Sequence, residues 1–487
     1  MHPIKIFGII AIIAAASAIY FKTSSERPQV VALAGSYEKQ ARDLRASLLA
    51  GDYSTVEKYF QQAHSAGPLK EHGRNATYSI LSTWFDSEYY LTNGTLQHIN
   101  NWINAFPDSA FAYMARAEFH YRRAWVSRTE RYAALIPESR LQGYYDGLAL
   151  AHEDITKNVL PRNPSIAYAY ERLIAIAAQT NGYFDTGEEI PQGAAFFQAV
   201  MAAVSGKPVM YAQQQKLLET AKANNIRDMF GIHNSYMFFS LAPQWGGSDE
   251  SMLAYARAVS KDAPADSTLP MLRVFAHETI ARGLSFDQKK AYYAQPGVWE
   301  ELKWAYDRVK TAYPQGAQWM VVFAKTAYDA GKYHLSAELM NTAYYTDPQY
   351  TRTYREMGEI YMNSSDSYGH AEKAFNEFLA IRTDHPDPYY WLGKIRFSQG
   401  KYDEAIRYSE QGLAVDADNC SLLGLRCSSN VRKENYQQAI EICGASMEMD
   451  PFCKPLYFNR AKAFKALNKS EEAKADQETY DYLDSFD

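Results

Sequence analysis

The sequence has no block of lysine and arginine residues, and its charge balance is mildly acidic. It holds 50 basic and 56 acidic side chains among 487 residues, for a formal net charge of −6 and an isoelectric point near 6.0. Nucleic-acid binding needs a concentrated basic face that neutralises phosphates. The composition therefore argues against a nucleic-acid partner.

Motifs of catalysis and cofactor binding are also missing. The sequence has no Gly-x-Ser-x-Gly turn, no phosphate-binding glycine loop and no dinucleotide-binding fingerprint. His277-Glu278 begins a metalloprotease-like string, but Ala281 stands where the second histidine is needed at helical spacing. We therefore expect no catalytic residue, no metal site and no cofactor, and we predict that the protein is not an enzyme.

Cysteine is scarce, and its four copies fall within one repeat length. They are Cys420, Cys427, Cys443 and Cys453. No histidine stands near them at a spacing typical of zinc sites. A disulfide between Cys427 and Cys443, joining paired helices, is one interpretation if the compartment is oxidising. Buried free thiols, which pack as small hydrophobic groups, are the interpretation that the sequence alone favours.

A long hydrophobic run stands near the amino terminus, at residues 6–21. It has 16 residues and lies between Lys5 and Lys22. A membrane-spanning helix needs about 20 residues and a signal-peptide core about 7–15, so this length lies between the two classes. We predict an uncleaved single-pass anchor in a bacterial inner membrane, with the body in the periplasm. The alternatives are a cleaved, periplasmic protein and the reverse topology with a cytoplasmic body.

An alanine recurs every 34 residues in the last third of the chain. The five positions are Ala337, Ala371, Ala405, Ala439 and Ala473. A small residue at a fixed period marks the place where the two helices of a hairpin approach closely, and a larger side chain there would overpack the contact by about 1–3 kcal/mol. The period predicts stacked helical hairpins that build a solenoid.

Residues 386–419 carry the fuller motif of this repeat. They supply Tyr389, Leu392-Gly393, the turn Gly400-Lys401-Tyr402 and Ala405. Over residues 317–487 the chain resembles the tetratricopeptide repeat family, with three clear repeats and, before them, two degenerate ones. The resemblance implies an all-α fold: an α-solenoid of tetratricopeptide-like helical hairpins, here with an amino-terminal hydrophobic helix. It also implies that a protein or peptide binds in a concave groove.

The part of the chain before these repeats also reads as helical, with longer and less regular units. The turn Leu241–Ser248, with the pattern Leu-x-Pro-x-Trp-Gly-Gly-Ser, and the segment Ala124–Arg128 resemble an uncharacterised bacterial helical domain family. That resemblance brings no known activity with it. We expect an anchor or signal sequence at 1–22, an irregular helical repeat domain at 36–285 and a tetratricopeptide repeat domain at 298–487.

The positions that face inward on the first helix of each repeat in this family carry aromatic and basic side chains. They are Tyr390, Lys394, Phe397, Phe458, Lys462 and Lys465. The resemblance implies a peptide-binding surface here, with the lysines facing an acidic peptide or its carboxylate. The function we expect is a membrane-tethered envelope scaffold or adaptor for a protein or peptide. The alternative is an envelope hydrolase with its active site in the amino-terminal helical half.

Overall fold

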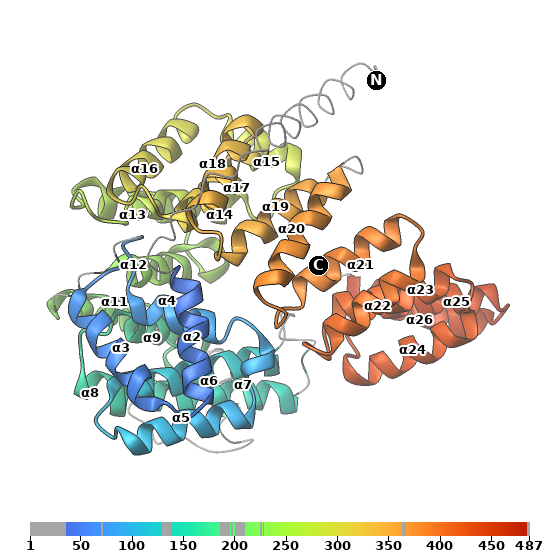
Figure 1. Ribbon diagram of the computed structural model, residues 1–487, viewed down its shortest axis with the longest axis horizontal. Coiled ribbons are helices and arrows are strands. Elements are labelled where there is room, and N and C mark those ends of the chain that lie inside the picture. Colours follow the sequence, from blue (N-terminus) through green and yellow to red (C-terminus); the bar gives the residue numbers. More distant parts are fainter. Residues whose placement is uncertain are drawn as a thin grey trace. The chain divides into compact units, whose positions relative to one another are not determined.

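The computed structural model describes residues 36–484, apart from 70–71, 129–135, 137, 186–194, 196–197, 200–209, 225, 227 and 363–366. Every regular element within these ranges is helical, and no strand is assigned there (Figure 1). The predicted all-α solenoid of helical hairpins is confirmed. The predicted amino-terminal hydrophobic helix lies outside the described residues.

The prediction of an inner-membrane anchor is corrected. No helix in the part of the chain that the structure describes is long and apolar enough to cross a membrane. The run at residues 6–21, on which that prediction was based, lies outside the described residues.

The chain divides into two compact units. The first unit ends at Thr353 and the second begins at Tyr354, and the short segment Ser87–Tyr89 groups with the second. The change in repeat type predicted between residues 285 and 298 therefore does not coincide with the division into compact units. The predicted domain limits, which rest on the change from irregular to regular helical repeats, stay a prediction.

The first unit is a succession of helical hairpins. Its helices are α2 (Tyr37–Leu49), α3 (Tyr53–Ala66), α4 (Ala76–Trp84), α5 (Asn93–Ala105), α6 (Ala110–Arg128), α7 (Glu138–Glu153), α8 (Leu160–Arg162), α9 (Ala167–Gln179), α11 (Met210–Ala223), α12 (Phe230–Tyr236), α13 (Asp249–Lys261), α14 (Met271–Ala281), α15 (Phe286–Tyr293), α16 (Val298–Ala312), α17 (Ala317–Asp329) and α18 (Tyr333–Thr346). Short 3-10 or π-helical turns accompany them: η3 (Asp154–Val159), η4 (Tyr183–Asp185), η5 (Met237–Leu241) and η6 (Pro243–Trp245), while most of η1 (Glu88–Tyr90) groups with the second unit.

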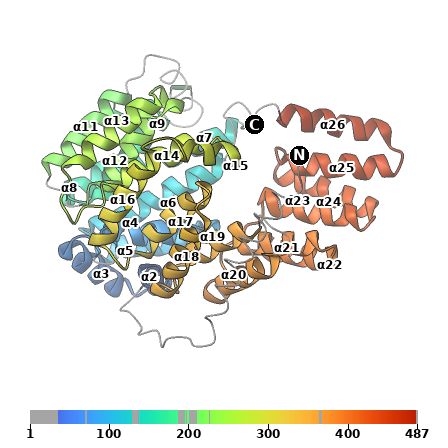
Figure 2. The same cartoon turned by 90° about the horizontal axis from the view of Figure 1, so that it is seen from above.

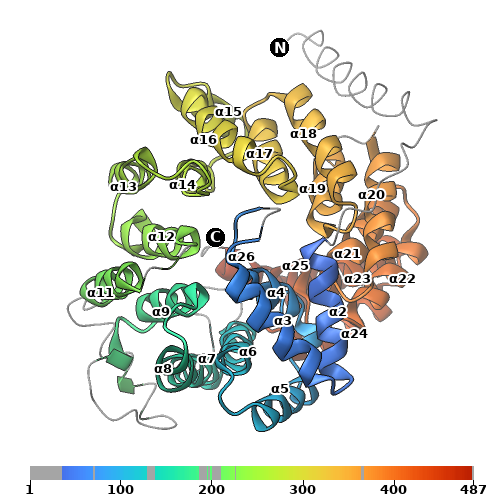
Figure 3. The same ribbon diagram turned by 60° about the vertical axis from the view of Figure 1, so that its left-hand side comes forward.

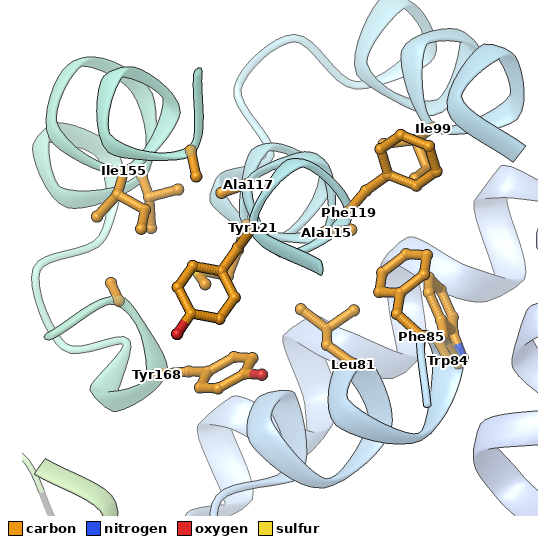
Figure 4. Close-up of a cluster of buried hydrophobic side chains, with 14 of the residues drawn as sticks. Leu81, Trp84, Phe85, Ile99, Ala115, Ala117, Phe119, Tyr121, Ile155 and Tyr168 are labelled. Carbon is orange, nitrogen blue, oxygen red and sulfur yellow. The ribbon is translucent and has the colours of Figure 1, made fainter. Parts of the chain in front are cut away.

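An aromatic core fills the first hairpins of this unit. Phe60 of α3 packs with ring centroids 5.8 Å from Trp84 and 5.7 Å from Trp102, and all three side chains are fully buried. Farther along, Phe85 meets Phe119 of α6 at 5.8 Å (Figure 4). Each buried aromatic of this size stabilises the fold by about 1.5–3 kcal/mol. Hydrophobic burial therefore explains why these less regular hairpins stay together.

The first unit closes on itself. The Glu38 carboxylate of α2 accepts hydrogen bonds from the backbone N–H of Thr351, at 3.0 Å, and from its hydroxyl, at 2.9 Å, although the two residues are 313 positions apart. Thr351 begins α19 (Thr351–Met362). Arg42 donates to Gln349 Oε1 at 2.7 Å. The hairpins therefore follow one another around a ring whose last members meet the first (Figure 3).

A buried arginine joins three segments of this ring. Arg74, in the loop before α4, donates through Nε to Asp228 at 3.2 Å and through a terminal nitrogen to Glu171 at 3.5 Å. The three side chains are between 1% and 7% exposed. Asp228 also accepts from the backbone N–H of Asn75 at 2.7 Å. Because buried charges are costly without partners, this network fixes the loop to α9 and to the segment before α12.

Two aromatic residues also contact the loop before α4, at His72 and Gly73. Trp319 Nε1 in α17 donates to the backbone carbonyl of His72 at 2.9 Å. Gly73 has a φ of +70°, and a Cβ at this position would lie 2.3 Å from the ring of Tyr313. A side chain at residue 73 would meet both a strained backbone and an occupied space.

The second unit is an array of hairpins with the predicted period. After the remainder of α19 its helices are α20 (Tyr368–Ile381), α21 (Asp387–Ser398), α22 (Tyr402–Leu413), α23 (Cys420–Arg432), α24 (Tyr436–Met449), α25 (Lys454–Ala466) and α26 (Ser470–Asp484). The hairpins α21–α22, α23–α24 and α25–α26 stack in register (Figure 2). We call the first helix of each of these hairpins its A helix.

The periodic alanines occupy the predicted close contacts in the middle of the array. Ala371, Ala405 and Ala439 are fully buried. Ala473 lies on the last helix and is half-buried, as is Ala337 in α18, where the neighbouring Ser336 is the buried small residue. A small residue is therefore needed at the alanine position of a repeat when another helix packs directly on that position.

Candidate functional site

Two groups of the predicted peptide-binding residues lie on two A helices. Tyr390, Lys394 and Phe397 are half-buried on α21. The Lys394 ammonium lies 4.9 Å from the ring centroid of Trp391 and 5.5 Å from that of Tyr390. Phe397 packs on Tyr402 at 5.5 Å. A cation held over aromatic faces is attracted by the ring quadrupole, so these side chains form one aromatic and basic cluster.

The second group is more exposed and lies on α25. Phe458 leaves 37% of its surface accessible, and the Lys462 ammonium stands 3.9 Å from its ring centroid. The Phe458 ring also lies 5.3 Å from the ring of Tyr480 in α26, measured between centroids. Lys465 is exposed one turn farther along the same helix.

The helix between these two groups, α23, carries small residues at the corresponding positions. Gly424 is buried, and a Cβ there would lie 2.8 Å from Pro455 Cβ, so glycine lets α23 and α25 approach closely. Ser428 is half-buried, and its hydroxyl donates to the Leu425 carbonyl at 3.0 Å. The structure brings the predicted residues together within each group and separates the groups by α23. We call this surface, from Tyr390, Lys394 and Phe397 across Gly424 and Ser428 to Phe458, Lys462 and Lys465, the A-helix face.

The four cysteines are arranged in two pairs. Cys427 of α23 is bonded to Cys443 of α24, with Cα atoms 5.5 Å apart. Cys420 is bonded to Cys453, with Cα atoms 5.4 Å apart. Both Cα separations suit a disulfide. The second pair has no counterpart in the predictions from sequence, because only the fold brings residues 33 positions apart to the same repeat junction.

His277 and Glu278 do not form a metal-ligand pair. His277 is buried, with Nδ1 2.6 Å from the Tyr292 hydroxyl and Nε2 3.4 Å from the Glu301 carboxylate. Glu278 instead accepts from the Thr326 hydroxyl at 2.6 Å, and burial raises its pKa. Each side chain therefore has its own structural partner.

The Glu301 carboxylate beside His277 interacts strongly with its charged and hydrogen-bonding neighbours. Burial alone would raise the pKa of Glu301, but hydrogen bonds from His277 and Arg257 outweigh it and hold the pKa at about 2. Arg257 reaches the carboxylate at 2.6 Å. The arrangement stabilises the charged form of the Glu301 carboxylate.

The charged network of Arg74, Glu171 and Asp228 was not found from the sequence. Burial raises the pKa of Glu171 to about 7, with Asp228 adding to the effect and Arg74 opposing it. A Cβ on Gly231 would lie 1.9 Å from Glu171 Oε1, so the carboxylate packs directly against the backbone of α12. Glu171 and Asp228 follow Arg74 by 97 and 154 positions, so no local sequence pattern could reveal the network.

The turn at 241–248 has a packing explanation for both of its glycines. Gly246 has a φ of +90°, and a Cβ there would lie 2.7 Å from the Tyr211 hydroxyl. A Cβ on Gly247 would lie 2.0 Å from the Leu241 carbonyl oxygen. Ser248 then caps α13, accepting from the Ser251 N–H at 3.1 Å. The pattern specifies a turn and a helix start.

Family models match two parts of the chain. Residues 40–155 match a domain of unknown function, DUF4034. Residues 386–419 and 455–487 match the tetratricopeptide repeat. The repeat at 420–453, which contains all four cysteines, lies between these two matches.

Two curated relatives share short stretches with the chain. The Hsp70/Hsp90 co-chaperone CNS1 of Saccharomyces cerevisiae is 31% identical over 87 residues, which is 17% of this chain and 23% of that protein. RNA polymerase II-associated protein 3 of Homo sapiens is 36% identical over 86 residues, or 18% of this chain and 13% of that protein. The chain thus spans less than a quarter of the length of either relative.

Solved structures of tetratricopeptide repeat proteins resemble the chain at low identity. YrrB, a TPR protein with an unusual peptide-binding site, is 15% identical with a TM-score of 0.31, covering 37% of this chain and 92% of its own. Yeast Tom70 is 13% identical with a TM-score of 0.32, covering 91% of this chain and 97% of its own. We draw no functional conclusion from scores of this size. The chain carries tetratricopeptide repeats in its second unit, and residues 40–155 are similar to the DUF4034 domain.

Proposed function

We propose that this protein is an adaptor whose A-helix face binds a segment of another protein. Tetratricopeptide repeats place their first helices side by side, and such arrays present extended binding surfaces. The observation that carries the proposal is the exposed pair of Phe458 and Lys462. Phe458 leaves 37% of its surface accessible with the Lys462 ammonium over its ring, and Gly424 on the preceding A helix carries no side chain and packs against Pro455 of α25.

The basic and aromatic side chains of the A-helix face indicate which kind of peptide segment it can bind. The ammonium groups of Lys394 and Lys462 lie over ring faces, at 4.9 Å from Trp391 and 3.9 Å from Phe458. A partner carboxylate can reach such an ammonium while an apolar partner side chain packs against the ring beside it. We therefore propose a peptide segment in which acidic and apolar residues are mixed. The proposal assigns no catalytic step to the chain.

The test uses peptides selected from a random display library against the purified full chain. Selected peptides are then measured by calorimetry against the wild type and against the double variant Phe458→Ala and Lys462→Ala. We expect an affinity loss of about tenfold or more, because exposed aromatic and basic anchors dominate such interfaces.

The matched control is the double variant Gln437→Ala and Glu441→Ala, which removes an exposed side-chain pair on the outer helix α24. This control should bind like the wild type. Selected peptides that are indifferent to Phe458 and Lys462 would show that the binding surface lies elsewhere.

A further inference from the structure

We propose that the Cys420–Cys453 disulfide is a reducible latch that fastens the terminal hairpin α25–α26 to the array. The Cys427–Cys443 disulfide, in contrast, is a permanent structural bridge. The inference goes beyond the proposed function, because it concerns redox control of the array and holds whatever the A-helix face binds.

The two bonds join different parts of the repeat. Cys420 is the first residue of α23, and Cys453 directly precedes α25, so their bond connects the starts of two successive A helices. Cys427 and Cys443 lie on α23 and α24, so their bond connects the two helices of one hairpin. Only the first bond spans the junction between two hairpins.

The two bonds also differ in access to solvent. Cys427, Cys443 and Cys453 are fully buried, whereas Cys420 is half-buried at the edge of their cluster. Thiol–disulfide exchange needs an attacking thiolate to reach one sulfur atom. Because Cys420 is the partly exposed member of the four cysteines, we expect a reductant in solution to attack the Cys420–Cys453 bond in the folded protein before the bond between the two fully buried cysteines.

The chemical step is exchange with a dithiol, either a small molecule or a protein with two neighbouring thiols. One thiolate of the reductant attacks Sγ of Cys420, and Sγ of Cys453 leaves as a thiolate that takes up a proton. The second thiol of the reductant then attacks the mixed disulfide as its thiolate and releases Cys420, which is protonated in turn. The protein gains two thiols, and the reductant leaves as its own disulfide.

The hairpin that the latch holds is joined to the preceding repeat by packing and by this one covalent bond. In an array of repeats each hairpin contacts its neighbours, and among the residues that the structure describes α25 packs against α23 and α24. Its ion pairs, Arg460 to Asp476 at 2.7 Å and Lys454 to Asp484 at 2.9 Å, join α25 to α26. These pairs join the two helices of the hairpin, while apolar packing of Leu456 with Leu423 and Met447 holds it to α23 and α24. Reduction of the latch removes the covalent tie between α25–α26 and α23, so that the hairpin opens more often and as one piece, together with Phe458, Lys462 and Lys465.

The first measurement follows the order of reduction in the oxidised full chain. Samples are treated with increasing dithiothreitol without denaturant, free thiols are alkylated, and mass spectrometry locates the label. We expect Cys420 and Cys453 to become labelled together before any label reaches Cys427 or Cys443. Simultaneous labelling of all four, or earlier labelling of Cys427 and Cys443, would overturn the proposal.

The second measurement follows hydrogen exchange of the backbone amides. We expect the double variant Cys420→Ser and Cys453→Ser to show about tenfold faster exchange in α25 and α26, with α21 and α22 unchanged, because only the terminal hairpin is released. Unchanged exchange in α25 and α26 would refute the latch.

The matched control is the double variant Cys427→Ser and Cys443→Ser. It should loosen α23 and α24 along with the terminal hairpin, since the bond that it removes lies within the preceding repeat. If the serine variants do not fold, the labelling order in the wild-type chain decides the question by itself.

Discussion

At the residue scale, the turns between the two helices of successive repeats show how one backbone requirement is met by different side chains. Gly400, Glu434 and Asn468 stand 34 positions apart and have φ values of +75°, +61° and +58°. Glycine adopts this left-handed conformation freely, whereas a residue with a Cβ is strained there. The glutamate at residue 434 is therefore a poor choice for its turn.

Replacing Glu434 with glycine should raise the free energy of unfolding of the second unit by roughly 1 kcal/mol, because the strain removed exceeds the added chain entropy. Urea unfolding followed by circular dichroism measures the change. Gly400→Ala is the matched control, since a Cβ at residue 400 meets no atom within 4 Å and only the backbone strain is introduced. It should lower stability by about the same amount. Equal stabilities for all three proteins would contradict the strain argument.

Glu171 gives a prediction about pH. Its pKa is raised by burial to about 7, above the 4.5 of an ordinary glutamate, with Asp228 adding to the rise and Arg74 opposing it. The folded state therefore binds a proton that the unfolded state has lost. Stability from this site is fully present below about pH 4.5 and is lost as the pH rises to about 7, by an amount on the order of 3 kcal/mol.

The variant Glu171→Gln stays neutral and should lose this dependence. We expect it to match the wild type near pH 5 and to be more stable by up to about 3 kcal/mol near pH 8. Denaturant unfolding at both pH values measures the difference, and Glu153→Gln, at an exposed position, controls for the substitution itself. A variant less stable than the wild type at pH 8 would show that Arg74 depends on the Glu171 charge.

At the element scale, the periodic alanines make a direct test of hairpin packing. Ala405 is fully buried between α21 and its neighbours, whereas Ala473 on the terminal helix is half-buried. Ala405→Leu should destabilise the second unit by about 1–3 kcal/mol through overpacking. Ala473→Leu should change stability by less than about 0.5 kcal/mol, since the residue is only half-buried. Thermal unfolding compares the two, and similar losses would mean that the period does not report helix contacts.

The sequence predicts the second unit well because the contacts that hold its repeats together join helices that are adjacent in the chain. Small residues at Ala371, Ala405 and Ala439 mark contacts between helices adjacent in the chain, and such contacts recur with the repeat. Ala337 shows where this reasoning ends: α18 follows a shifted register, and Ser336 takes the buried position. A fixed period cannot detect a shift of one residue where the repeat degenerates.

The closure of the first unit and its charged network could not be predicted, because their causes are not local. Arg74 meets Asp228 across 154 positions and Glu38 meets Thr351 across 313. Neither partner has a distinctive sequence context. Similarly, the sequence placed Lys394 and Lys462 on the A helices but gave no sign that they lie over aromatic rings, since a ring contact depends on side-chain rotamers.

At the scale of the whole molecule, the two compact units make a prediction for calorimetry. All four cysteines belong to the second unit. Reduction of both disulfides should therefore lower the temperature of one unfolding transition and leave the other in place. A bridge that closes a loop of this length contributes about 3 kcal/mol, which for a unit of this size corresponds to roughly 10 °C.

Differential scanning calorimetry of the oxidised and the fully reduced chain measures both transitions. The Cys427→Ser and Cys443→Ser variant in its oxidised form should show part of the shift. A single transition that moves as a whole on reduction would mean that the units unfold together.

The closed first unit also constrains how the protein is made. Glu38 leaves the ribosome 313 residues before Thr351. At 5–20 residues added per second, this interval lasts roughly 15–60 s. Throughout it the nascent amino-terminal helices lack the partner that completes their ring, so co-translational folding of this unit must end late. Chaperones that shield incomplete chains, and the pace of translation before codon 351, should therefore affect its yield more than that of the locally built repeats.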